Sequence, residues 1–185
     1  MKISEIATLP TKHGIFKIQS FKEGDKEHLV IFTENIPEIP LVRIHSECLT
    51  GDALGSLKCD CGEQLDFALK AINEKGGMVI YLRQEGRGIG LFNKVNAYAL
   101  QDKGLDTVEA NHQLGFEADL RDFSIVEKIL NHFGIKKIKL LTNNPRKLFS
   151  LKNIEVVERI PIKVTPNKFN ENYLKTKKEK LGHKL

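Results

Sequence analysis

The sequence contains no tryptophan, only three cysteines and no long apolar run. A membrane-spanning helix needs about 18 or more consecutive apolar residues, and no stretch comes near that length. The N-terminal residues also lack the apolar core of a secretion signal. These absences exclude a membrane protein and predict a cytoplasmic one. An odd number of cysteines cannot pair completely within one chain, and a cytoplasmic location disfavours disulfides, so the thiols need another explanation.

Acidic residues are fewer than basic ones, with 24 aspartates and glutamates against 29 lysines and arginines. The 185 residues carry a formal net charge of +5, and much of the excess lies in a basic C-terminal tail that begins at about residue 170. An excess of positive charge favours a polyanionic ligand, either nucleic acid or a phosphorylated small molecule. Because phenylalanine and tyrosine are not interleaved with a basic stripe, we expect no nucleic acid partner.

The first third of the chain is rich in β-prone residues. Short runs at 15–18, 29–32 and 41–44 are separated by glycine, proline, aspartate and asparagine, and they predict an antiparallel start. Continuous apolar runs at 78–82 and 138–141 are typical of strands that are buried on both faces.

Helical spacing follows residue 61. Leu65, Ala68, Leu69 and Ile72 recur at i, i+3, i+4 and i+7, and Gly76 ends this helix. Three more helices are predicted: one that reaches about residue 103 with Ile89, Phe92, Val95 and Ala99 on one side, one that carries Val126, Ile129, Leu130 and Phe133, and one that begins at Asn144-Pro145. We therefore predict a single domain over residues 1–185 of the α/β (mixed α+β) class. Its antiparallel β N-terminal part leads into a mixed sheet with packed helices.

The three cysteines follow the pattern Cys48-x10-Cys59-x-Cys61. Thiolates bind zinc well, and three protein ligands leave one tetrahedral position open for water. Zinc lowers the pKa of such a water to about 7, which makes it a nucleophile at neutral pH. A structural zinc site is the alternative, because His45 could supply a fourth ligand. Three unrelated buried thiols remain a further alternative.

A glycine-rich turn occupies residues 85–90, between a predicted strand and a predicted helix. Glycines let the backbone approach a phosphate, and the free N–H groups of a helix N-terminus attract anions. The spacing is neither a dinucleotide fingerprint nor a P-loop, so a tight turn that needs positive φ explains it equally well. Arg87 favours the phosphate hypothesis, because a guanidinium can bind phosphate at two points.

A second strand-to-helix corner spans residues 142–147. In open α/β sheets the ligand lies at this end of the strands. A plain capped helix start is the alternative. Taken alone, residues 119–122 indicate a helix cap with a surface ion pair, and Tyr98 indicates a half-buried core residue.

Blocks of sequence in order over residues 43–145 resemble the motifs of the GTP cyclohydrolase II family. They are RIHSECLTGD (43–52), SLKCDCG (56–62), RQEGRGIGL (83–91), YALQD (98–102), DTVEAN (106–111), LGF (114–116), RDF (121–123) and LLTNNP (140–145). The resemblance implies hydrolysis of GTP to 2,5-diamino-6-(5-phosphoribosylamino)pyrimidin-4(3H)-one, formate and pyrophosphate, the first step of riboflavin biosynthesis. It also implies one Zn²⁺ per subunit, Mg²⁺ with the triphosphate, and a homodimer. The chain is too short for the synthase domain that some relatives carry, so we expect a monofunctional enzyme.

The resemblance also assigns residue roles. The zinc ligands are Cys48, Cys59 and Cys61. The nucleotide-binding residues are Arg43, Ile44, His45, Ser46, Glu47, Gln64, Glu85, Gly86, Arg87, Thr107, Thr142 and Lys147. The catalytic residues are Asp119 as a proton acceptor, Arg121 as a nucleophile on the α-phosphate, and Tyr98 as an aid at the ring.

The nucleophilic role of Arg121 conflicts with its chemistry. A guanidinium is protonated at any ordinary pH and has no free lone pair. We therefore expect Arg121 to stabilise charge on the α-phosphate while Asp119 orients it. Two other functions stay open: a related zinc hydrolase that stops at the ring-opened formamide, and a non-enzymatic zinc module that binds nucleic acid through the basic tail.

Overall fold

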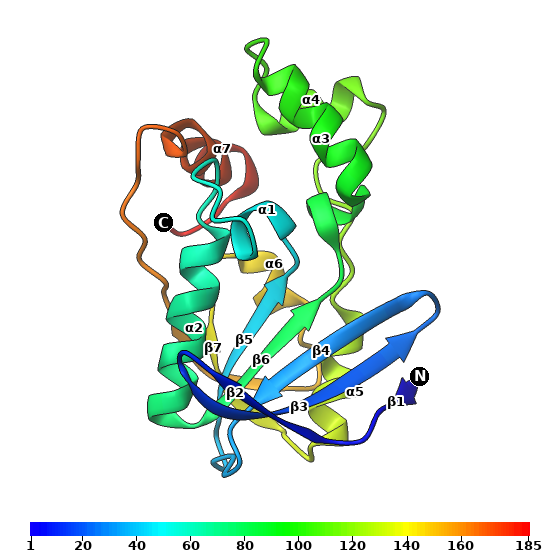
Figure 1. The fold of residues 1–185 in the computed structure, drawn as a ribbon, viewed down its shortest axis with the longest axis vertical. Coiled ribbons are helices and arrows are strands. Elements are labelled where there is room, and N and C mark those ends of the chain that lie inside the picture. Colours follow the sequence, from blue (N-terminus) through cyan, green and yellow to red (C-terminus); the bar gives the residue numbers. More distant parts are fainter.

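The structure is a computed structural model that describes residues 1–185 (Figure 1). Its strands are β1 (Lys2–Ile3), β2 (Ala7–Thr11), β3 (Gly14–Glu23), β4 (Lys26–Phe32), β5 (Leu41–Ser46), β6 (Gly77–Leu82), β7 (Lys137–Leu141) and β8 (Glu155–Ile160). Its α-helices are α1 (Leu49–Asp52), α2 (Cys61–Lys75), α3 (Gly90–Gln101), α4 (Thr107–Gln113), α5 (Ser124–His132), α6 (Pro145–Phe149) and α7 (Glu171–Leu181), and η1 (Glu85–Gly88) is a short 3₁₀ turn.

All the strands belong to one mixed sheet. Its order is β1-β3-β4-β6-β5-β7-β8, and β2 pairs with β3 outside that path. The early strands pair antiparallel, as does β4 with β6, whereas β5 pairs parallel with both β6 and β7, and β7 with β8. This arrangement confirms the predicted α/β class, in which an antiparallel start leads into a mixed sheet.

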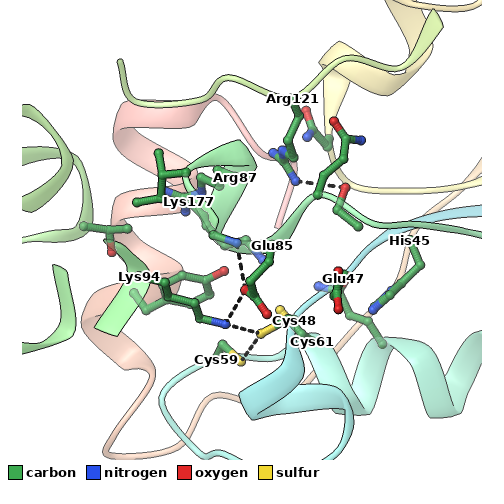
Figure 2. Close-up of a pocket in the computed structure, with 18 of the residues that line it drawn as sticks. His45, Glu47, Cys48, Cys59, Cys61, Glu85, Arg87, Lys94, Arg121 and Lys177 are labelled. Atoms are coloured by element: carbon green, nitrogen blue, oxygen red, sulfur yellow. Dashed lines mark hydrogen bonds and ion pairs between the residues drawn. The ribbon is translucent and has the colours of Figure 1, made fainter. Parts of the chain in front are cut away.

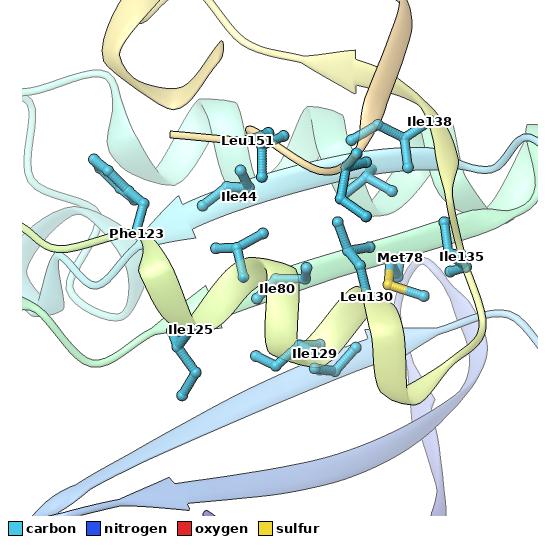
Figure 3. Close-up of a cluster of buried hydrophobic side chains, with 14 of the residues drawn as sticks. Ile44, Met78, Ile80, Phe123, Ile125, Ile129, Leu130, Ile135, Ile138 and Leu151 are labelled. Atoms are coloured by element: carbon cyan, nitrogen blue, oxygen red, sulfur yellow. The ribbon is translucent and has the colours of Figure 1, made fainter. Parts of the chain in front are cut away.

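Helix α5 covers one face of the sheet and forms the larger core (Figure 3). Side chains on a strand alternate between faces, so Met78, Ile80 and Leu82 of β6 point to this side. They pack with Ile129 and Leu130 of α5, and all five are fully buried. Val126, Ile129 and Leu130, which the apolar spacing of this helix predicted to share one face, all lie in this core.

Helix α2 covers the opposite face. Its buried residues Ala68 and Ile72 pack with Val79 of β6 and Leu41 of β5. The helix ends at Lys75, as predicted, with Gly76 at a φ of 79°. The next residue, Gly77, must be a glycine for a different reason, because a Cβ at this position would lie 1.9 Å from the carbonyl oxygen of Leu41. That close approach lets β5 and β6 pair from their first residues.

Helix α3 turns its apolar side to solvent. Phe92 is 80% exposed and Val95 54% exposed, whereas the residues it buries are Lys94 and Ala97. Together with α4, it stands away from the sheet (Figure 1). The apolar spacing therefore located this helix but did not indicate what the helix packs against.

Replacing Ile129 by alanine should destabilise the fold strongly. Ile129 is fully buried between α5 and the sheet, so Ile129→Ala should lower the free energy of unfolding by about 2–5 kcal/mol. Ile15 is the matched control, because it is 70% exposed and Ile15→Ala should change stability by no more than about 0.5 kcal/mol. Urea unfolding followed by circular dichroism measures both. Equal effects would contradict the packing described here.

Candidate active site

The parallel strands β5, β6 and β7 end at one edge of the sheet, and the segments that follow them meet around a single cavity. This is the edge at which open α/β sheets bind ligands. Most of the residues predicted for the site line the cavity: Arg43, His45, Ser46, Glu47, Cys48, Cys59, Cys61, Gln64, Glu85, Gly86, Arg87, Tyr98, Thr107, Arg121, Thr142 and Lys147.

Two of the predicted residues do not line it. Ile44 is fully buried in the core on the α5 face, because it alternates with Arg43 and His45 along β5. Only its carbonyl group turns toward the site, where it accepts a hydrogen bond of 2.7 Å from Lys147. Asp119 lies behind Arg121 and contacts the cavity through that residue.

The three cysteine sulfurs lie within 4.8 Å of one another (Figure 2). Cys48 follows β5, whereas Cys61 begins α2 and Cys59 comes just before its N-cap. Gly51 makes room for them, because a Cβ there would lie 2.7 Å from the sulfur of Cys59. A compact set of three thiols beside a cavity fits a zinc ion with one open position.

His45 does not join this group of sulfurs. Its Nε2 donates to Asp52 over 2.9 Å, and its ring stacks on Tyr81. Asp52 also accepts hydrogen bonds from the Tyr81 hydroxyl and from the backbone N–H of Cys48. The geometry therefore does not support a structural zinc site with His45 as the fourth ligand. Instead, His45 and Asp52 hold the segment that carries Cys48.

The thiols share their protons unequally. A hydrogen bond from Cys59 lowers the pKa of Cys48, and the same bond raises the pKa of Cys59 to about 11. Lys94 adds positive charge, because its ammonium donates to the Cys48 sulfur over 3.1 Å and to Glu85 over 2.7 Å (Figure 2). The Lys94 ammonium therefore favours the thiolate form of Cys48, which is the form in which a cysteine binds a metal.

The glycine-rich turn has the positive φ of a tight turn and also the features of a phosphate-binding turn. Gly86 has a φ of 62°, and Arg87 has a φ of 59° and is the one non-glycine residue with positive φ. Both terminal nitrogens of the Arg87 guanidinium are buried without a hydrogen-bond partner. A strained backbone that presents a buried, unpaired cation to a cavity is typical of an anion-binding site.

Glu85 ties this turn to the cysteine segment. One carboxylate oxygen accepts the N–H of Leu49 over 2.7 Å, and the other accepts from Lys94 and from Gly86. These bonds occupy both oxygens. The carboxylate therefore positions the turn next to the cysteines.

The base of the cavity is rich in buried cations. Burial lowers the pKa of Arg43 to about 10, and it lowers the pKa of Lys147 well below its usual range. Arg43 donates to Gln64 over 2.5 Å and to the carbonyl of Leu141, and neither group is charged. An anionic ligand in the cavity would raise both pKa values and favour the protonated forms of Arg43 and Lys147.

Asp119 and Arg121 form a two-point ion pair, with contacts of 2.8 and 2.6 Å. Arg146 makes a further contact of 2.6 Å with Asp119. Burial alone would raise the pKa of Asp119, but the hydrogen bonds from Arg121 outweigh burial and lower it to about 2. A carboxylate with so low a pKa is a weak proton acceptor at neutral pH.

Tyr98 on α3 approaches the cysteines through Thr50. Its hydroxyl shares a hydrogen bond of 3.3 Å with the Thr50 hydroxyl, which lies 3.6 Å from the Cys48 sulfur. Burial raises the pKa of Tyr98, so the phenol keeps its proton. A neutral phenol at this position can donate a hydrogen bond.

Sequence reasoning missed several residues of the cavity. Lys94 is the buried residue on the polar side of α3, and nothing in the apolar spacing distinguished it. Tyr173, Lys177 and His183 belong to the C-terminal segment predicted to be a basic tail, yet they line the cavity. The sequence does carry a signal for a helix in that segment, because Tyr173, Leu174 and Lys177 have the spacing of one helical face.

Comparison with known proteins identifies the family. The model of the GTP cyclohydrolase II family matches residues 2–161. The chain belongs to the GTP cyclohydrolase II family. The GTP cyclohydrolase-2 of Campylobacter hominis is 63% identical over 185 residues, which cover 100% of this chain and 96% of that protein. The GTP cyclohydrolase-2 of Campylobacter fetus subsp. fetus is 64% identical over an alignment that covers 98% of this chain and 95% of that protein. The GTP cyclohydrolase-2 of Helicobacter pylori (strain Shi470) is 59% identical over an alignment that covers 100% of this chain and 98% of that protein.

Membership of the GTP cyclohydrolase II family confirms the resemblance drawn from the motifs and the prediction of a hydrolase. The family implies the riboflavin pathway. None of the helices of this family member combines the length and the apolarity that a membrane crossing requires.

The stability of this GTP cyclohydrolase II family member should depend on pH through His183. Burial lowers the pKa of His183 from 6.5 to about 3. Between these two pH values His183 is protonated in the unfolded chain and neutral in the folded protein. Stability is therefore lost as the pH falls from 6.5 toward 3, and none of this loss occurs above 6.5. Urea unfolding at about pH 7.5 and about pH 5 should show a smaller loss for His183→Gln than for the wild type. Identical losses would contradict the burial of His183.

Proposed function

We propose that this protein hydrolyses GTP to 2,5-diamino-6-(5-phosphoribosylamino)pyrimidin-4(3H)-one, formate and pyrophosphate. The observation that carries the proposal is the juxtaposition, in one cavity, of three clustered cysteine sulfurs and the unpaired guanidinium of Arg87. The first suits a metal ion and the second suits a phosphate. The names of the relatives supply GTP as the substrate.

Cys48, Cys59 and Cys61 would hold one zinc ion per subunit. When bound, zinc supplies a Lewis acid and lowers the pKa of a coordinated water. The chain's own contribution is to place the guanine ring against this position and to exclude bulk water. The Tyr98 hydroxyl shares a hydrogen bond with Thr50 near the sulfurs, and Lys94 balances the charge of the Cys48 thiolate.

The triphosphate would be bound by the cations on the other side of the cavity. Arg87 has two free buried nitrogens, and Lys147 is fully desolvated, so both gain when an anion reaches them. A Mg²⁺ ion would accompany the triphosphate. The remaining residues expected to contact the nucleotide through their side chains are His45, Ser46, Glu47, Gln64, Thr107 and Thr142, which line the same cavity.

Arg121 would stabilise charge on the α-phosphate. Asp119 holds the guanidinium at two points and stays ionised, which orients Arg121 and keeps it protonated. A protonated guanidinium is an electrostatic partner for phosphate. This geometry supports stabilisation rather than nucleophilic attack.

A cytoplasmic homodimer is the proposed form of the enzyme. The apolar side of α3 supports the dimer, because Leu91, Phe92 and Val95 are 42%, 80% and 54% exposed in the single chain.

Measuring formate release and GTP consumption separates the proposed reaction from its rivals. An enzyme that stops at the ring-opened formamide would release no formate, and a nucleic-acid module would leave GTP unchanged.

Removing one sulfur ligand should abolish the reaction. Cys59→Ser is expected to lose most of its zinc, measured by atomic emission, and to release no detectable formate from GTP. Arg87→Ala should keep its zinc while the KM for GTP rises about tenfold or more, a loss of at least about 1.4 kcal/mol. Normal formate release from zinc-free Cys59→Ser would disprove the metal proposal.

The role of Arg121 can be tested by a search for a covalent intermediate. Rapid acid quenching of the enzyme with GTP, followed by intact mass spectrometry, should detect no nucleotide or phosphate attached to the chain. Arg121→Ala should lower kcat by about a hundredfold to a thousandfold, because one stabilising group is lost from the transition state. A trapped adduct on Arg121 would show that the electrostatic role is wrong.

A further inference from the structure

We propose that the C-terminal helix α7 is part of the active site, and that its Lys177 is a positioning residue that fixes the Cys59-Asp60-Cys61 segment through Asp60. The inference rests on the proposed zinc site. The family model matches residues 2–161, and α7 begins at Glu171, beyond that match.

Asp60 lies between two of the proposed metal ligands and is almost completely buried, with a side-chain exposure of 1%. It occupies the N-cap position of α2 but makes no side-chain cap hydrogen bond. An aspartate at an N-cap normally accepts from the free N–H groups of the first helical turn. In this protein its carboxylate serves other partners.

Those partners are Lys177 and Gln64. The ammonium of Lys177 donates to one carboxylate oxygen of Asp60 over 2.7 Å, and Gln64 donates to the other over 2.5 Å. Gln64 in turn accepts a hydrogen bond from Arg43 on β5. A buried chain of hydrogen bonds therefore joins α7, the cysteine segment and the central sheet, and such fully satisfied networks rigidify their members.

Helix α7 is anchored at two further places. Lys180 pairs with Asp106 at the start of α4, and the backbone N–H of Lys184 donates to the carbonyl of Asn143 over 3.0 Å. The ammonium of Lys177 also lies 4.9 Å from the ring centre of Tyr173, which faces Arg87. The helix and the residues that follow it thus contact the metal segment, the segment after β7 and the start of α4, and Tyr173 and Lys177 line the cavity. Figure 1 shows α7 near the start of α2.

Removing Lys177 would leave the buried carboxylate of Asp60, beside the thiols, without its ion-pair partner. Such a group cannot stay in place at low cost, because a buried charge needs a partner or water. The segment between Cys59 and Cys61 would have to turn Asp60 outward, and both sulfur atoms move with it. Lys177 therefore acts on the metal site through Asp60, without touching the metal.

The test compares Lys177→Met with Lys178→Met, its exposed neighbour on the same helix. Zinc dissociation constants come from chelator competition, and folding is checked by thermal unfolding. We expect Lys177→Met to weaken zinc binding about 10- to 100-fold, the usual effect of losing a partner of a metal-ligand segment. Lys178→Met should stay within about twofold of the wild type, because it touches no part of the network. At saturating zinc, kcat for GTP should fall in Lys177→Met more than KM rises.

The double variant Asp60→Asn/Lys177→Met removes both charges and is the second arm, which keeps the test decisive if Lys177→Met does not fold. Its zinc dissociation constant should exceed that of the wild type, because Asp60 no longer holds the segment, and it should stay below that of Lys177→Met where that variant folds. The inference is overturned if both variants bind zinc as the wild type does and differ only in melting temperature. A rise confined to KM also overturns it, because Lys177 would then contact the nucleotide directly. A wild-type protein that binds no zinc would overturn the proposed function itself.

Discussion

The parallel pairing of β5 with its two neighbours is the constraint on which the site depends. It brings the ends of β5, β6 and β7 to one edge of the sheet, and each strand is followed there by a different part of the site. Cys48 follows the first, the Arg87 turn the second, and the segment of Lys147 the third. Because β5 is central, its alternate side chains do both tasks: Val42 and Ile44 build the core while Arg43 and His45 face the cavity.

Much of this arrangement could be predicted from local patterns. The period of 3.6 located α2 and α5, continuous apolar runs located β6 and β7, and Asn144-Pro145 marked the start of α6. The spacing of the three cysteines indicated a metal, and the structure gathers their sulfurs as that hypothesis requires. These features depend on residues that are near one another in the chain, which is why a sequence reveals them.

What the sequence did not reveal depends on contacts between distant residues. Lys94 reaches Cys48 across 46 positions, and Lys177 reaches Asp60 across 117. Each of these lysines lies on a helix whose polar side could equally have faced water. The exposed Phe92 shows the reverse case, since its apolar spacing suggested a core contact that a single chain does not provide. Spacing gives the face of a helix, but only the tertiary fold decides what that face meets.

The buried basic groups at the base of the cavity have one more consequence. Arg43 and Lys147 are buried, and the charge of Arg43 disfavours the charged form of Lys147, so this pair of basic groups opposes folding. A bound polyphosphate removes that repulsion and binds only the folded chain, so it shifts the folding equilibrium by mass action. Supply of the nucleotide should therefore govern how long the protein survives in the cell as well as how fast it works.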